Sequence, residues 1–196
     1  MFIGDTTTAV SPSNWIKRHK FTVDEYYRMG EIGLIGPEEH VELIEGEIFE
    51  KTPICSYHAS IVNHLSSLLI TVVKDEGIVS VQNPVRLSDR TEPEPDLAIL
   101  KPRDDFYRKQ HPTANDTLLV VEVSNASERF DREIKLLLYA NHGIPEIWII
   151  SIEQKTLSIY RSPNGDRYEH EQATDTPRSV TLSALPEVSV DLSTLF

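Results

Sequence analysis

Apolar residues recur along the chain with two spacings, one typical of helices and one typical of strands. Between Tyr57 and Lys74 they recur every three or four positions, which predicts an amphipathic helix. A second helix is predicted over Glu128–His142, with Gly143 as its stop. A short helix is expected to begin at Thr22, because Thr22 and Glu25 have the spacing of a capping box.

Short apolar runs predict the strands of a central sheet, since strands covered on both faces are apolar throughout. A strand pair around Glu45-Gly46 and edge strands around the turn at Ser162–Gly165 are expected to extend the set. The order of helices and strands predicts an α/β (α+β) chain, with a central mixed β-sheet flanked by helices. The predicted strands are Val41–Glu50 (the pair), Ile78–Leu87, Asp96–Leu100, Leu118–Ser124, Ile147–Ile150, Thr156–Tyr160 and Tyr168 onward.

The chain is expected to consist of an N-terminal arm, one domain and a tail that packs on that domain. Residues 1–20 are polar and rich in Thr and Ser, and we expect them to form a flexible N-terminal arm. Residues 21–196 are expected to form a single domain, because this length is enough for a real core. The Pro- and Ser-broken tail Leu182–Phe196 is expected to pack on it as irregular cover.

Composition limits the binding partners and cellular compartments that fit this chain. The formal net charge is −12, which argues against tight nucleic-acid binding through bulk charge but permits a local basic groove or a bridging metal. The single cysteine, Cys55, rules out an internal disulfide and fits a reducing compartment. The sequence shows neither a signal-peptide pattern nor an apolar stretch of membrane-spanning length, so we expect a cytoplasmic protein without a membrane partner.

Two carboxylates and a lysine are the most informative chemical groups. Asp96 lies at the mouth of one apolar strand, and Glu122 lies inside another, 26 positions later. A carboxylate inside an apolar strand is costly unless a partner compensates it, and a divalent metal shared with a second carboxylate is one such partner. Lys135, on the next helix, could be brought back toward Glu122; a structural salt bridge of Glu122 with Lys135 or Arg132 is the alternative.

Strand and helix periodicities predict which way these side chains point. Glu122 should share a sheet face with its alternate neighbours Val120 and Ser124, while Val121 and Val123 face the other way. On the helix, Asp131 and Lys135 are four positions apart and should point the same way. An apolar stripe about 100° around the helix is expected to pack on the sheet; its members are Phe130, Ile134 and Leu137.

Several of these residues form a string with a known counterpart. Pro95-Asp96 followed by Glu122-Val123-Ser124 resembles the PD-(D/E)XK nuclease signature. The longer string resembles the Uma-two family of restriction-endonuclease-like proteins, from about Phe21 to Arg161. Besides the residues already named, it comprises Glu42–Glu47, His58, Leu119–Ser124, Asp131, Lys135, Tyr139 and Gly143–Trp148.

The resemblance implies a restriction-endonuclease-like fold that cuts a phosphodiester with Mg²⁺ or Mn²⁺. Asp96 and Glu122 would be metal ligands, since hard oxygen donors suit these ions. Ser124 occupies the superfamily's usual lysine position, and Lys135 would supply that charge from the helix. Glu42 would be a further acidic ligand or would position water, with Glu45 as the alternative. Supporting roles fall to Asp131, which would position Lys135, and to His58.

Three functions stay open at this point. The first is a metal-dependent nuclease that hydrolyses DNA phosphodiester bonds, in which case a homodimer with two sites fits two strands. The second is a catalytically inactive binding or regulatory module of the same fold, suggested by Ser124 and the acidic charge. The third is a hydrolase of small phosphoesters, which an acidic surface penalises less than polymers. The basic loop Lys101–Asp116 is either a solvated loop or a flap that contacts phosphates.

Overall fold

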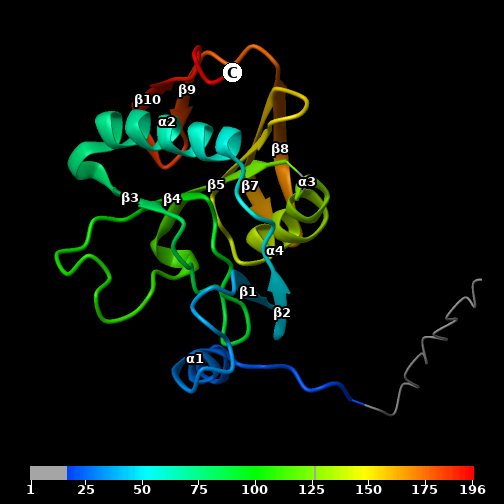
Figure 1. The fold of residues 1–196 in the computed structure, drawn as a ribbon. Helices are drawn as coiled ribbons and strands as arrows, with labels where there is room; N and C mark the ends of the chain where they lie inside the picture. The colour runs from blue at the N-terminus through cyan, green and yellow to red at the C-terminus, as the bar shows by residue number, and fades with distance from the viewer. Residues whose placement is uncertain (1–16, 126) are drawn as a thin grey trace, which may run out of the picture.

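A six-stranded mixed sheet forms the centre of the computed structural model, which describes residues 17–125 and 127–196 (Figure 1). β5 and β6 are parallel, and every other neighbouring pair is antiparallel. This confirms the predicted α+β class with a central mixed sheet. In sheet order the strands are β3 (Ile78–Val81), β4 (Leu97–Leu100), β5 (Thr117–Ser124), β6 (Glu146–Ser151), β7 (Thr156–Asn164) and β8 (Arg167–Thr174).

One face of the sheet is covered by α2 (Ser56–Val73) and by a C-terminal hairpin of β9 (Ser179–Leu182) and β10 (Leu185–Asp191). Figure 1 shows α2 and this hairpin together on the same side of the sheet. The other face is covered by one continuous helical segment. It consists of α3 (Glu128–Phe130), the π-helical η3 (Asp131–Lys135) and α4 (Leu136–Asn141).

The N-terminal elements lie on the side of the sheet away from α2 in Figure 1. They are α1 (Val23–Glu31) and the hairpin of β1 (Val41–Ile44) and β2 (Glu47–Glu50); two short 3₁₀ turns, η1 (Lys74–Glu76) and η2 (Ala114–Asp116), connect later elements. The predicted capping box is present: the Thr22 side chain accepts from the Glu25 N–H, and the Glu25 carboxylate accepts from the Thr22 N–H. Residues 1–16 of the predicted arm lie outside the described residues. None of the described helices is long and apolar enough to cross a membrane.

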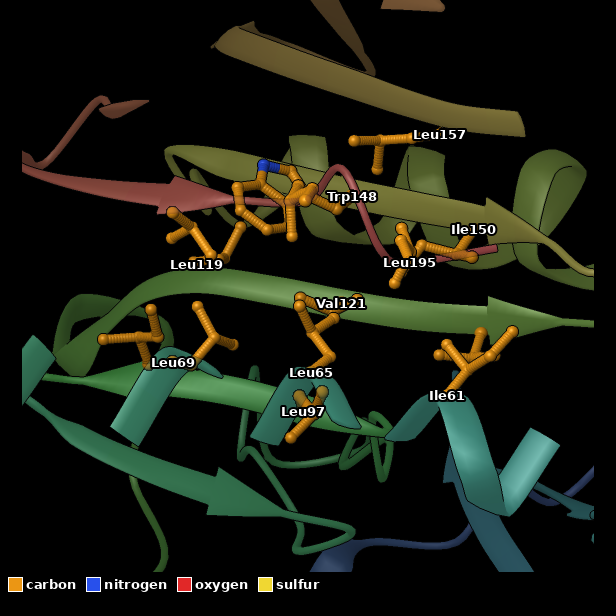
Figure 2. Packing of buried hydrophobic residues seen from close by; sticks show 14 of the residues in the cluster. Ile61, Leu65, Leu69, Leu97, Leu119, Val121, Trp148, Ile150, Leu157 and Leu195 are labelled. Atoms are coloured by element: carbon orange, nitrogen blue, oxygen red, sulfur yellow. The ribbon is translucent and has the colours of Figure 1, made fainter. Parts of the chain in front are cut away.

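The main core lies between α2 and the sheet. Figure 2 shows Ile61, Leu65 and Leu69 of α2 packed against the strands, with Leu195 of the tail closing the cluster. Strand residues of one parity, such as Val121, face this cluster. A second cluster on the opposite face joins the other parity to α4, and its members are Val120, Tyr139, Ile144, Ile147, Ile149 and Tyr160.

Some predicted elements were wrong. The tail is an ordered hairpin rather than irregular cover, because its alternating apolar side chains, Leu182, Val188 and Val190 among them, pack into the main core. The strand predicted over Ile78–Leu87 ends at Val81, three residues before Pro84, which lacks the N–H that a ladder needs. β7 is longer than expected and lies inside the sheet, so β8 alone forms that edge.

We expect Leu65→Ala to lower the free energy of unfolding by about 2–5 kcal/mol, because it leaves a cavity at a fully buried position between α2 and the sheet. Ile70→Ala, on the exposed side of the same helix at 56% exposure, is the matched control and should change it by less than about 0.5 kcal/mol. Urea denaturation followed by circular dichroism measures both. Equal losses would show that α2 does not pack as described.

Candidate active site

β4 and β5 bring Asp96 and Glu122 to the same place on the sheet. The strands are antiparallel, and their pairing ends with Leu97 opposite Val121. One further step along each strand places Asp96 opposite Glu122, and opposite residues of an antiparallel pair share a face. Since Val121 packs under α2, both carboxylates belong to the opposite face, toward η3. Strand alternation had predicted this orientation for Glu122.

Asp96 accepts its shorter hydrogen bonds through one carboxylate oxygen, Oδ2. Its Oδ2 accepts the backbone N–H of Val123 at 2.9 Å and the Nε2–H of His58, in the first turn of α2, at 3.1 Å. Among the described residues, its Oδ1 has only a long contact, 3.4 Å, with Nε2 of Gln82. Asp96 is therefore anchored at the end of the β4–β5 ladder, with Oδ1 the less engaged oxygen.

Glu122 lies against the ammonium group of Lys135, as the helical position of that lysine had suggested. Nζ of Lys135 is 3.3 Å from Glu122 Oε1 and 3.1 Å from Glu42 Oε2, and all three side chains are at most 5% exposed. Glu42 Oε2 also accepts the backbone N–H of Glu94 at 3.1 Å. Glu122 Oε1 accepts a hydrogen bond from the Tyr139 hydroxyl at 2.7 Å. One ammonium thus joins carboxylates from β1 and β5.

Within the helical segment, η3 turns its polar side toward the sheet. Asp131 and Lys135 are 4% exposed, whereas Ile134 and Leu137 are 43% exposed. The expectation that the stripe containing Ile134 and Leu137 packs on the sheet was therefore wrong. The sheet face below carries Glu122 and its polar neighbours, so the lysine finds its partners there. The π-helical turn over 131–135 lies at this contact, as π-turns often do at functional sites.

Asp131 supports this arrangement from the side. Its Oδ2 accepts hydrogen bonds from the hydroxyls of Ser124 and Ser127, both at 2.8 Å. Ser124, in the position where the superfamily signature has lysine, is therefore used to hold a buried carboxylate near Lys135. The sequence had placed Asp131 and Lys135 on the same side of the helix, and both are indeed directed inward.

These groups surround one pocket. Asp96, Glu122 and Lys135 all line it, together with His58 and Gln82, and Asp131 borders it. The rest of the wall comes from the end of β2 and the β2–α2 connection, the segment before β4, the end of β5 and the chain from there into α3. Those residues are Glu50, Lys51, Thr52, Pro53, Ile54, Cys55, Glu94, Val123, Asn125, Ser127 and Phe130.

Burial and charge shift the protonation of the pocket residues. Burial raises the pKa of Glu122 to about 8, although the charge of Lys135 acts to lower it. Burial also raises the pKa of Asp131, against Lys135 and the two serine hydroxyls. Burial acts on Asp96 in the same direction, but His58, the Val123 N–H and the charge of Lys135 together outweigh it, so the Asp96 pKa is lowered. Burial would lower the pKa of Lys135, yet the carboxylates, Glu122 first, raise it.

Not every candidate from the sequence lies at this pocket. Glu42 contacts Lys135 from behind and is absent from the pocket wall. Glu45 is exposed on the turn between β1 and β2, where its N–H donates to the Thr91 hydroxyl. The basic loop 101–116 leaves β4 at Leu100, the end opposite Asp96, and contributes nothing to the pocket wall.

Two residues that contact the predicted carboxylates were missed as site residues. Gln82 fell inside the predicted strand Ile78–Leu87, yet it has φ +49° and its side chain approaches Asp96. Such a backbone conformation is unusual for a residue with a side chain and tends to occur at functional sites. Tyr139 belonged to the family-like string, but its partner, Glu122, is on another element, so spacing alone could not reveal it.

The donor set suits a hard divalent cation. Asp96 and Glu122 both contribute carboxylates to the pocket wall, and in the described residues no group of three or more His, Cys, Asp or Glu forms a metal site. Mg²⁺ is commonly held by one or two carboxylates, with water and substrate phosphate completing its shell. Two carboxylates with less engaged oxygens fit that pattern.

A family model named Uma2, with the description "Putative restriction endonuclease", matches residues 23–193, which span α1 through β10. The chain belongs to the Uma2 family. The resemblance noted from the sequence is thereby confirmed, and it extends to the C-terminal hairpin. No curated protein matches the chain.

A solved structure shares the Uma2 chain's fold. It is a "putative nuclease belonging to DUF820" from Anabaena variabilis, 19% identical, with a TM-score of 0.69. The likeness covers 90% of this chain and 97% of that chain. At this identity the likeness shows the fold, and together with the family it supports a restriction-endonuclease-like nuclease.

We expect Glu122→Gln to remove a pH-dependent penalty on folding in this Uma2 protein. Burial raises the folded-state pKa to about 8, from the ordinary 4.5. The folded state therefore binds this proton more tightly than the unfolded chain does. The contribution of Glu122 to the free energy of unfolding is complete at low pH and is lost as the pH rises through about 8. Urea denaturation at a series of pH values should therefore show that the free energy of unfolding of the variant rises relative to that of the wild type between about pH 5 and 8.

The matched control for this series is Glu133→Gln, which removes an exposed carboxylate from the same helical segment. Its stability difference from the wild type should stay constant over the same pH range. A constant difference for Glu122→Gln as well would mean that Glu122 titrates as an ordinary glutamate.

Proposed function

We propose that this protein is a metal-dependent endonuclease that hydrolyses DNA phosphodiester bonds. The observation that carries the proposal is the meeting of Asp96, Glu122 and Lys135 at one pocket, from two strands and a helix. Two carboxylates beside an amine are the groups that metal-assisted phosphodiester hydrolysis needs. The family's description as a restriction endonuclease supports the same reaction class.

Asp96 and Glu122 would hold Mg²⁺ or Mn²⁺ through their less engaged oxygens. The bound ion would supply an activated water and compensate charge on the phosphate. His58 and the Val123 N–H fix the Asp96 carboxylate, so its geometry does not depend on the ion. Lys135 keeps its positive charge beside the pocket and can orient the attacking water or neutralise the developing oxyanion.

Glu42 is best assigned to Lys135 rather than to the metal. It is 3.1 Å from Nζ of Lys135, accepts a backbone N–H, and lies behind the pocket wall. Those contacts support a tether that sets where the ammonium lies. The sequence had left both Glu42 and Glu45 open; the exposed position of Glu45 gives it no part in this proposal.

The inactive-module alternative rested on Ser124 in the superfamily's lysine position. Lys135 beside Glu122 supports the enzyme instead, since the missing charge is present from another element. Activity confined to DNA would rule out the small-phosphoester alternative. A homodimer and a cytoplasmic location stay predictions, and light scattering after size exclusion tests the first.

Asp96→Asn and Glu122→Gln should each lower DNA cleavage with Mg²⁺ or Mn²⁺ by at least about a thousandfold, because several kcal/mol of charge stabilisation depend on a correctly held ion. Cleavage is measured on single-stranded, duplex and branched DNA at high enzyme concentration. Glu133→Gln, which removes an exposed carboxylate, should cleave like the wild type.

Two outcomes would contradict the nuclease proposal. One is the absence of metal-dependent cleavage by the wild type on all three kinds of DNA. The other is cleavage that survives in both pocket variants, which would indicate a contaminating nuclease. Calorimetry then distinguishes the inactive module from the enzyme. A wild type that binds no Mn²⁺ would favour the inactive module, because the proposed reaction needs a bound ion.

Glu42→Gln tests the tether. We expect kcat to fall by about tenfold or more while the Kd for Mn²⁺ changes by less than about twofold, because Lys135 would lose a charged partner and the metal ligands would not. Steady-state kinetics and calorimetry measure the two quantities. Glu45→Gln, in the same hairpin, is the matched control and should leave both unchanged. A lost Mn²⁺ site in Glu42→Gln would instead make Glu42 a ligand.

A further inference from the structure

Tyr139 lies directly behind the pocket on α4. Its ring is fully buried in the second core cluster, and its hydroxyl donates to Glu122 Oε1 at 2.7 Å. Buried tyrosine hydroxyls usually have a hydrogen-bond partner. Here that partner is a proposed metal ligand, which gives the hydroxyl an influence on the pocket without any contact with it.

Two donors meet on the same carboxylate oxygen. Glu122 Oε1 has the Tyr139 hydroxyl at 2.7 Å and Nζ of Lys135 at 3.3 Å. No described residue donates a hydrogen bond to the other oxygen, Oε2, although Glu122 lines the pocket. The position of the carboxylate is thus fixed through Oε1, and Oε2 is the oxygen that can coordinate a ligand.

Without the hydroxyl, little would fix the rotation of this carboxylate. The last torsion of a glutamate side chain has a broad preference, so neighbours must set it. Lys135 would be the remaining donor, and an ammonium attracts both oxygens of a carboxylate alike. Rotation toward Lys135 would withdraw Oε2 from the pocket.

We propose that Tyr139 is a positioning residue: its hydroxyl fixes Oε1 of Glu122 so that Oε2 stays available to a divalent cation. This inference rests on the proposed metal-dependent function and assigns a residue that sets metal affinity. Tyr139 acts through Glu122 and does not touch substrate. Groups that hold metal ligands in this way typically change metal affinity by about 10- to 100-fold when removed.

The decisive measurement is Mn²⁺ binding to the full chain by calorimetry, without DNA. Tyr139→Phe should weaken the Kd for Mn²⁺ by about tenfold or more. Tyr160→Phe is the matched control: Tyr160 packs in the same cluster, and its hydroxyl donates to a carboxylate, Glu171 Oε1, at 3.0 Å, outside the pocket. Its Mn²⁺ affinity should equal that of the wild type.

A double-mutant cycle shows whether Tyr139 acts through Glu122. In a Glu122→Gln background, Tyr139→Phe should cause no further loss of Mn²⁺ affinity, whereas a general packing defect would add to the loss. Tyr139→4-aminophenylalanine keeps a donor at the same place and should restore Mn²⁺ affinity to within about twofold of the wild type. That variant also decides the question if Tyr139→Phe does not fold.

The outcomes separate the two proposals. Wild type that binds Mn²⁺ together with a Tyr139→Phe variant that binds it equally well overturns the role of Tyr139 and leaves the nuclease proposal standing. A 4-aminophenylalanine variant that folds but binds Mn²⁺ weakly also overturns that role. Wild type that binds no Mn²⁺ overturns the metal-dependent function, and the positioning role with it.

Discussion

The ammonium group of Lys135, shared between Glu42 and Glu122, is the interaction on which the rest of the site depends. Two carboxylates cannot be buried side by side without a compensating charge, and removing one partner of such a group leaves an uncompensated charge inside the protein. Because the three residues come from β1, the central β5 and η3, this contact also fixes how the N-terminal hairpin and the helical segment sit against the sheet.

Local patterns were enough for the parts of the fold that are governed by neighbouring residues. The capping box at Thr22, the long helix α2 and the central strands follow from spacing within a few positions. The face of β5 that carries Glu122 also followed, since alternation in a strand has few exceptions. The C-terminal hairpin could not be predicted in the same way, because its order comes from packing against α2 rather than from its Pro- and Ser-interrupted sequence.

The helical segment shows why the candidate site was only partly predictable. Hydrophobic periodicity assumes that a helix packs on an apolar surface, and under that assumption Ile134 should face the sheet. The sheet face here is polar where Glu122 and Ser124 lie, so Lys135 and Asp131 are buried and Ile134 is exposed. The partner of a buried charge decides the orientation, and the partner lies in another element. For the same reason Tyr139 was not assigned to the site, and Glu42 was expected to bind metal or position water rather than to pair with Lys135.

The charges at the pocket explain why an acidic protein can still be a nuclease. Both lysines of the pocket wall are already paired, Lys51 with Glu94 and Lys135 with Glu42 and Glu122, so the described wall offers a phosphate no uncommitted positive charge. A chain with a net charge of −12 cannot attract a polyanion by bulk charge either. Under the proposed function, a cation taken from solution would supply positive charge at the pocket itself. Asp96, whose pKa is lowered by His58, the Val123 N–H and Lys135, and Glu122, held at one oxygen, are suited to bind it. Under the proposed metal-dependent function, metal binding would strengthen substrate binding, because the same ion would supply the charge that the phosphate needs.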